Sequence, residues 1–172
     1  YWGIDFFGLP QDRGWENSAY TMHFYPGIFG WGQANWITHA RFLKDGLPDW
    51  VKRMERMEAP LLVGEFQVVF KDAGGGEMMR RYYDQDNGYG WAATAWSYKI
   101  VHPSGGIGGG SWGMVVNKDP VEVPDLNTWS KERLEDYFLM LGTMEYAIDE
   151  DLRHWMTTSD LPAELPPHPK VL

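Results

Sequence analysis

A single carboxylate at the end of a short apolar run is the residue best suited to chemistry in this sequence. The run Leu61-Leu62-Val63-Gly64 leads directly to Glu65. Such a run is typical of a buried parallel strand, because both faces of that strand are covered. A charge at its carboxyl end emerges where parallel α/β sheets hold their ligands. Because an unpaired buried carboxylate is costly, Glu65 is expected to have either a structural partner or a catalytic role.

Two further strand-like segments end in side chains that suit chemistry on a sugar. Residues 19–25 carry His23 and Tyr25, and residues 91–99 carry Trp96. The carboxyl ends of parallel strands converge on one site, so these side chains are expected to meet the carboxylate. The carboxylate could attack an anomeric carbon, the hydroxyl could orient it, and the indole ring could support the sugar. Each residue also has a structural alternative. The two aromatic rings could simply pack, and the histidine could lie in the core or at the rim with its ring nitrogens hydrogen-bonded.

Strands alternate with helices along the chain, which predicts a parallel sheet with crossover helices. A fourth strand is expected at Gly3 to Phe7. The expected helices cover Trp36 to Leu43, Pro48 to Ala59, Gly76 to Asp86 and Lys131 to Ile148. The last helix has Ser130 as its predicted N-cap and an inner stripe of Leu134, Phe138, Leu141 and Tyr146. Residues 1–160 are expected to form one domain, and the proline-rich residues 161–172 an extended tail.

The composition favours a carbohydrate ligand over several other classes. Ten Trp, nine Tyr and eight Phe exceed the needs of core packing, and such rings can stack on sugar faces, although a Trp-rich core is the alternative. A net charge of −9 without a basic cluster argues against nucleic acid and anionic membrane partners. The absence of cysteine excludes disulfides and thiolate metal sites. No run approaches the ~18 apolar residues that a membrane span requires.

Three segments, in this order, resemble strand motifs six, seven and eight of glycoside hydrolase family 5, the cellulase-like retaining β-glycosidases. They are Tyr20 to Tyr25, Pro60 to Phe66 and Gly90 to Lys99. The resemblance covers roughly residues 18 to 148. It implies an α/β fold, the (β/α)8 TIM barrel, of which this chain would supply about the last four β/α units. It also implies activity without a metal or organic cofactor.

The resemblance implies a role for each matching residue. Glu65 corresponds to the nucleophile, His23 and Tyr25 to residues that line the sugar subsite beside it, and Trp96 to the aromatic platform. Lys99 falls in the same motif as Trp96 and is a candidate for substrate binding. Four tryptophans in or near loops could form further sugar subsites or could simply pack in the core: Trp15, Trp31, Trp36 and Trp112.

The sequence departs from the family at the general acid/base, which the family carries in an Asn-Glu-Pro segment. No such segment occurs here. A retaining mechanism needs a second carboxyl group about 5–5.5 Å from the nucleophile. Glu16, Glu58 and Glu77 are the local alternatives, but none stands clearly at a strand end. We therefore expect the acid/base to lie on another chain, which would be the N-terminal half of the barrel. The alternative is that this chain associates with its own copy.

These observations predict a retaining β-glycoside hydrolase, similar to an endo-β-glucanase or cellulase, that cleaves β-linked glucan through a glycosyl-enzyme on Glu65. The enzyme is expected to be inactive without the half that holds its acid. The resemblance also favours a secreted protein. Two alternatives stay open: a noncatalytic carbohydrate-binding module, and a purely structural half-barrel.

Overall fold

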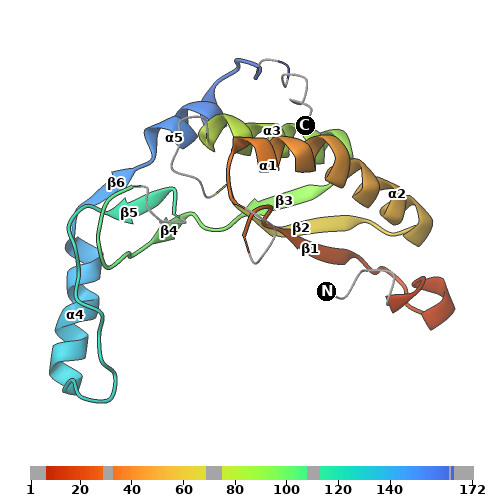
Figure 1. The fold of residues 1–172 in the computed structure, drawn as a ribbon. Coiled ribbons are helices and arrows are strands. Elements are labelled where there is room, and N and C mark those ends of the chain that lie inside the picture. Colours follow the sequence, from red (N-terminus) through yellow and green to blue (C-terminus); the bar gives the residue numbers. More distant parts are fainter. Residues whose placement is uncertain (1–6, 29–32, 69–74, 108–112, 163, 165–172) are drawn as a thin grey trace.

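The computed structural model describes residues 7–28, 33–68, 75–107, 113–162 and 164. Its first sheet contains three parallel strands in the order β1-β2-β3 (Figure 1). These strands are β1 (Tyr20–Phe24), β2 (Leu61–Phe66) and β3 (Ala92–Ala95). They fall within the three segments that the sequence predicts to be strands, so the parallel β/α rhythm is confirmed for this part of the chain.

Helical structure between β1 and β2 runs from Trp36 to Met57. It consists of α1 (Trp36–Arg41), a π-helical segment (Phe42–Gly46) and α2 (Leu47–Met57). Asn35 caps α1 by accepting a hydrogen bond from the Thr38 N–H, 2.9 Å away. The chain leaves α2 through Glu58, which has a left-handed conformation. The predicted helices at 36–43 and 48–59 are therefore confirmed, with small shifts in their bounds.

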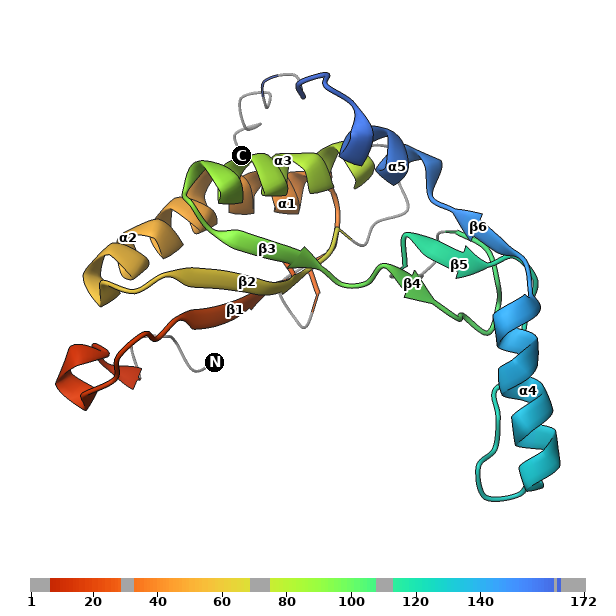
Figure 2. The same ribbon diagram turned by 180° about the vertical axis from the view of Figure 1, so that it is seen from behind.

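The helices α1, α2 and α3 (Gly75–Gly88) lie on the same side of the parallel sheet, as Figure 2 shows from behind. Their apolar side chains and those of the strands form one core. Its most deeply buried members are Leu43, Leu47, Val63, Phe66, Met78, Met79 and Tyr82. The other side of the sheet is covered by no described helix or strand, and its side chains include the exposed Leu62.

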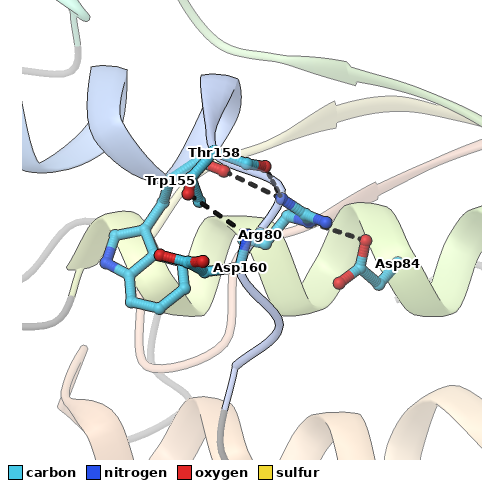
Figure 3. Close-up of polar contacts among 5 residues, drawn as sticks. All are labelled: Arg80, Asp84, Trp155, Thr158 and Asp160. Atoms are coloured by element: carbon cyan, nitrogen blue, oxygen red, sulfur yellow. Dashed lines mark hydrogen bonds and ion pairs between the residues drawn. The ribbon is translucent and has the colours of Figure 1, made fainter.

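Helix α5 (Glu150–Thr157) packs against α3 and is tied to it at both ends, and Figure 3 shows the contacts at its carboxyl end. The Arg80 guanidinium donates to the backbone carbonyls of Trp155 and Thr158, at 3.2 and 3.0 Å, and to the Asp84 carboxylate at 2.8 Å. At the other end the Asp151 carboxylate accepts a hydrogen bond from the Gly76 N–H, at 2.8 Å. The sequence did not predict α5.

The second sheet has the order β4-β5-β6 and lies beside the end of β3 (Figure 1). It contains β4 (Lys99–Ile100), β5 (Val115–Asn117) and β6 (Tyr146–Ile148). The β4–β5 pair is parallel and the β5–β6 pair is antiparallel. Helix α4 (Lys131–Thr143) connects β5 to β6 and projects away from the rest of the molecule.

The predicted TIM barrel is wrong. A (β/α)8 barrel requires a continuous parallel sheet, whereas the described residues form two separate three-stranded sheets, one of which contains an antiparallel pair. The chain leaves the first sheet after β3 and enters the second within four residues. The local sequence could not indicate this, because β4 pairs with a strand fifteen residues away whose apolar pattern is short.

Other predictions differ in detail. The segment 91–99 is divided between β3 and β4. Helix α4 ends at Thr143 instead of Ile148, because Tyr146 to Ile148 pair with β5. Its Ser130 N-cap is confirmed, but its predicted inner stripe is not, since no residue of α4 is buried and Phe138 is 58% exposed.

Some predictions fall outside the described residues. Among them are most of the expected strand Gly3 to Phe7, of which only Phe7 is described, and most of the tail 161–172. Among the described residues, no helix is long and apolar enough to cross a bilayer.

Candidate functional site

Strand β2 contains a bulge immediately before its carboxyl end. On one side Val63 pairs with Met22 and Glu65 with His23, so Gly64 has no partner in β1. On the other side β2 advances three residues from Val63 while β3 advances two. One extra residue in β2 therefore interrupts the ladder with both neighbours, as in a β-bulge.

The bulge decides which way Glu65 faces. Side chains alternate along a regular strand, so Leu61, Val63 and Glu65 would all point toward the helices. Instead Leu61, Val63 and Phe66 are buried in the core, with a spacing of two and then three residues. The extra residue moves Phe66 into the core and leaves Glu65 on the open face, where 30% of its side chain is exposed. The apolar run ending in Glu65 thus delivers its carboxylate to an accessible edge.

Glu65 is contacted there by the two β1 residues that the sequence predicts. The Tyr25 hydroxyl donates a hydrogen bond to Glu65 Oε2 at 2.9 Å. His23 Nδ1 lies 3.3 Å from the same oxygen, within ion-pair distance if the imidazole is protonated. Both contacts involve Oε2, and within the described part of the chain none involves Oε1.

Tyr25 acts as a neutral donor in this cluster. Partial burial raises the pKa of its phenol, and the hydrogen bond to Glu65 and the negative charge of that carboxylate raise the pKa further. All three causes disfavour the phenolate. Tyr25 therefore keeps its proton at any pH near neutrality, and it can orient Glu65 without competing for a proton.

Trp96 follows β3 at the same edge of the sheet. Its backbone N–H donates to the Phe66 carbonyl, 3.0 Å away, which fixes it next to the end of β2. The peptide bond from Trp96 to Ser97 is cis. The ring is 51% exposed, so it is available as a platform, and no contact with Glu65 is recorded.

The other predicted binding residues that the structure describes make their contacts elsewhere. Lys99 lies in β4, and its ammonium is 3.5 Å from the centroid of the Tyr146 ring, a cation–π contact. Trp15 precedes β1 and so lies toward the opposite, amino end of the sheet. Trp36 begins α1, with the Arg81 guanidinium 5.4 Å from its ring centroid. Trp31 and Trp112 lie outside the described residues.

None of the three local alternatives for a second carboxyl group accompanies Glu65. Glu16 precedes β1 and Glu58 precedes β2, so a strand length of roughly 16–20 Å separates them from the carboxyl edge. Glu58 instead accepts a hydrogen bond from Gln11 Nε2, at 3.3 Å. Glu77 lies in α3 and is paired with Arg81. In the described part of the chain, the titratable groups recorded in contact with Glu65 are His23 and Tyr25.

Sequence reasoning missed the residues that shape the bulge, although one signal was present. A glycine directly before the carboxylate, within a run of branched residues, is typical of a bulge or a close backbone approach. Thr94 faces this bulge from β3, and its hydroxyl donates to the Gly64 carbonyl. Periodicity alone assigns Thr94 only to one face of a strand.

A second polar group, buried in the helix layer, was also missed. His39 and Tyr82 are buried, and the His39 Nδ1 lies 2.8 Å from the Tyr82 hydroxyl. Asp86 lies one helical turn after Tyr82 and is 1% exposed, and neither of its carboxylate oxygens has a hydrogen-bond partner among the residues that the structure describes. Burial lowers the pKa of His39 to about 4 and raises the pKa of Asp86 to about 7. Both groups are therefore biased toward their neutral forms.

No cluster of three or more His, Cys, Asp or Glu residues suited to a metal ion occurs among the described residues. Comparisons with protein-family models, with curated proteins and with solved structures found no match. The functional interpretation therefore depends on the geometry of the cluster itself.

Proposed function

We propose that this chain carries the nucleophile of a retaining β-glycosidase of the cellulase-like family 5 type, acting on β-linked glucan. The observation that supports this most strongly is the shared contact of His23 and Tyr25 with one oxygen of Glu65. Tyr25 donates to Oε2 and the His23 ring lies against the same oxygen, so the carboxylate is held from one side while no contact to Oε1 is found among the described residues. An oriented carboxylate at the same edge of the sheet as an exposed tryptophan suits nucleophilic attack on a sugar.

In this mechanism Oε1 of Glu65 attacks C1 of the sugar while the bond from C1 to the leaving oxygen breaks. The leaving oxygen takes a proton from a carboxylic acid, and Glu65 becomes a glycosyl ester. The same acid, now a carboxylate, then takes a proton from a water molecule, which attacks C1 and releases Glu65. Tyr25 and His23 stabilise the carboxylate as it is released, and Trp96 supports the sugar ring.

The acid/base in this proposal is supplied by a further polypeptide that lies over the open face of the parallel sheet. Sheets with only parallel strands are normally covered on both faces, whereas the described helices cover one. The open face also bears Glu65, whose described surroundings supply no second carboxyl group. A covering polypeptide would therefore supply the missing acid where the nucleophile needs it. A second copy of this chain could also cover the open face.

An activated aryl β-glucoside tests the nucleophile without the missing acid, because its phenolate leaves without a proton. We expect a burst of phenolate, up to about one equivalent per chain, followed by slow or no turnover. Glu65→Gln should abolish the burst. Glu55→Gln, which changes an exposed carboxylate on α2 in the same way, should leave it intact. A burst that survives in Glu65→Gln would overturn the proposal.

A noncatalytic carbohydrate-binding module is the second candidate, favoured by the lack of a second carboxyl group near Glu65. It predicts binding of a β-glucan oligosaccharide, measured by calorimetry, with no phenolate burst. Binding should then be weakened by Trp96→Ala and be nearly unchanged in Glu65→Gln.

A further inference from the structure

The bulge that turns Glu65 outward is contacted from the neighbouring strand by a hydroxyl group. Thr94 lies in β3 between Ala93, which pairs with Val63, and Ala95, which pairs with Phe66. It therefore stands opposite two residues of β2, Gly64 and Glu65. Its hydroxyl donates to the Gly64 carbonyl and lies 3.3 Å from the Val63 carbonyl. These contacts tie both residues before Glu65 to β3.

The opposite side of the bulge is closed by β1. A Cβ added at Gly64 would lie 2.5 Å from Thr21 Oγ1 and 3.1 Å from His23 Nε2. The first distance is far below van der Waals contact, so a Cβ at position 64 would force the Thr21 hydroxyl to rotate away or the bulge and β1 to move apart. The His23 ring thus lies directly over Gly64 while its Nδ1 contacts Glu65.

We propose that Thr94 is a positioning residue, whose hydroxyl holds the Gly64 bulge and thereby keeps the Glu65 carboxylate in contact with His23 and Tyr25. Thr94 does not contact Glu65 itself in any recorded hydrogen bond, so it acts through the backbone of β2. Without the hydroxyl, the bulge loses this side-chain contact with β3 and is held only by the backbone pairs on either side of it, Val63 with Ala93 and Phe66 with Ala95. The Glu65 side chain can then leave the position in which Tyr25 donates to it.

For catalysis this inference rests on the proposed function. A displacement of a reacting group by about 1 Å can reduce the rate by about 10²-fold. Loss of the Thr94 hydroxyl should therefore slow attack by Glu65 while leaving sugar binding at Trp96 in place.

The ionisation of Tyr25 provides a test that does not depend on catalysis. The pKa of Tyr25 is raised partly by its hydrogen bond to Glu65 and by the charge of that carboxylate. We would follow tyrosinate absorbance against pH in Thr94→Val, and subtract the curve of the same variant carrying Tyr25→Phe. We expect Tyr25 to ionise at a pH lower by about one unit or more than in the unmodified chain, which is a tenfold change in its acid constant. Circular dichroism restricts the comparison to the pH range in which each protein stays folded.

Three further variants serve as controls. Thr94→Ser keeps the hydroxyl and should restore the original ionisation of Tyr25. Thr157→Val removes the hydroxyl that donates to the Arg153 carbonyl at 2.8 Å on α5, and should leave Tyr25 unchanged. Thr94→Ala removes the same hydroxyl and should also lower the ionisation pH of Tyr25, which gives a second route should Thr94→Val fold poorly. If Thr94→Val or Thr94→Ala folds and Tyr25 ionises as in the unmodified chain, the positioning role is overturned.

The phenolate burst separates this inference from the proposed function. In Thr94→Val we expect the rate constant of the burst to fall about 10²-fold with little change in KM, and Thr94→Ser to restore it. If the unmodified chain shows no burst but Tyr25 ionises at a lower pH in Thr94→Val than in the unmodified chain, the glycosidase proposal fails and the positioning role stands. If the burst and the Tyr25 titration are both unchanged in Thr94→Val, the positioning role fails and the glycosidase proposal stands.

Discussion

Tyr25 and Glu65, forty residues apart in sequence, are joined by a 2.9 Å hydrogen bond from the phenol hydroxyl to Oε2. The bond links the end of β1 to the end of β2. It forms because the bulge in β2 places Glu65 opposite His23, two residues before Tyr25. The orientation of the proposed nucleophile is thus set by β2 and by residues at, and directly after, the end of β1.

Removal of this hydroxyl should impair glycosyl transfer to Glu65. In Tyr25→Phe we expect the rate constant for phenolate release from an activated aryl β-glucoside to fall by about 10- to 10²-fold, because the carboxylate loses a donor that fixes its orientation. Tyr98→Phe is the matched control, since Tyr98 is 71% exposed, and it should react at the original rate. Equal rates in the two variants would contradict the role assigned to Tyr25.

The buried groups His39 and Asp86 should make opposite contributions to stability as pH changes. The pKa of Asp86 is raised by burial from 3.8 to about 7, so the folded state binds more protons than the unfolded state between these values. Stability from this group therefore falls as pH rises from about 4 to 7. The pKa of His39 is lowered by burial from 6.5 to about 4, so its contribution falls as pH drops through the same range. The two effects partly cancel between about pH 4 and 6.5.

Asp86→Asn should remove the contribution of Asp86 to the pH dependence of stability. We expect its free energy of unfolding, relative to the unmodified chain, to increase from pH 4 to pH 7, by about 1.4 kcal/mol for each unit of the Asp86 shift that is realised. His39→Gln should show the reverse, with its relative stability increasing as pH falls from 6.5 to 4. Urea denaturation at several pH values measures both. A pH-independent difference for both variants would contradict the assigned protonation states.

The Arg80 guanidinium should stabilise the end of α5. It makes hydrogen bonds to the carbonyl of Trp155 in α5 and to that of its C-cap, Thr158, and an ion pair with Asp84, and its side chain is 18% exposed. Arg80→Lys keeps the charge but loses the geometry of the guanidinium, so we expect it to lower the free energy of unfolding by about 1–3 kcal/mol. Arg153→Lys alters an exposed pair with Glu150 and should cost about 0.5 kcal/mol or less. Similar losses in the two variants would argue against the Arg80 contacts.

Helix α4 should contribute little through its apolar side chains. Phe138→Ala should change the free energy of unfolding by about 0.5 kcal/mol or less, because the ring is 58% exposed. Phe66→Ala should cost about 3–5 kcal/mol, because that ring is buried and stacks on Tyr82 with centroids 5.5 Å apart. Chemical denaturation of the two variants compares the projecting helix with the core. A large loss in Phe138→Ala would mean that α4 is packed against another surface in solution.

The elements best predicted from the sequence are those whose stability is decided locally. The apolar run before Glu65 and the helical spacing of Trp50, Met54 and Met57 correctly locate β2 and α2. The side chains at the strand ends also locate His23 and Tyr25 beside Glu65, because parallel strands end at the same edge.

The features that sequence reasoning missed depend on partners distant in the chain. Tyr146 to Ile148 continue a helical pattern, but they form β6 because β5 offers backbone partners about thirty residues earlier. The barrel was wrong for the same reason, since the pairing of β4 with β5 cannot be read from either strand alone. The bulge at Gly64 has a local signal in the glycine, but its effect on Glu65 requires the register of both neighbours.

The most direct test of the proposed nucleophile is to trap the glycosyl ester. A dinitrophenyl 2-deoxy-2-fluoro-β-glucoside combines a leaving group that needs no acid with a fluorine that slows hydrolysis of the ester. We predict that mass spectrometry of the intact chain shows one added fluoroglucosyl group, and that peptide mapping places it on Glu65. The Glu65→Gln variant should stay unlabelled. Absence of the adduct from the folded chain, or an adduct on any other residue, would contradict the account.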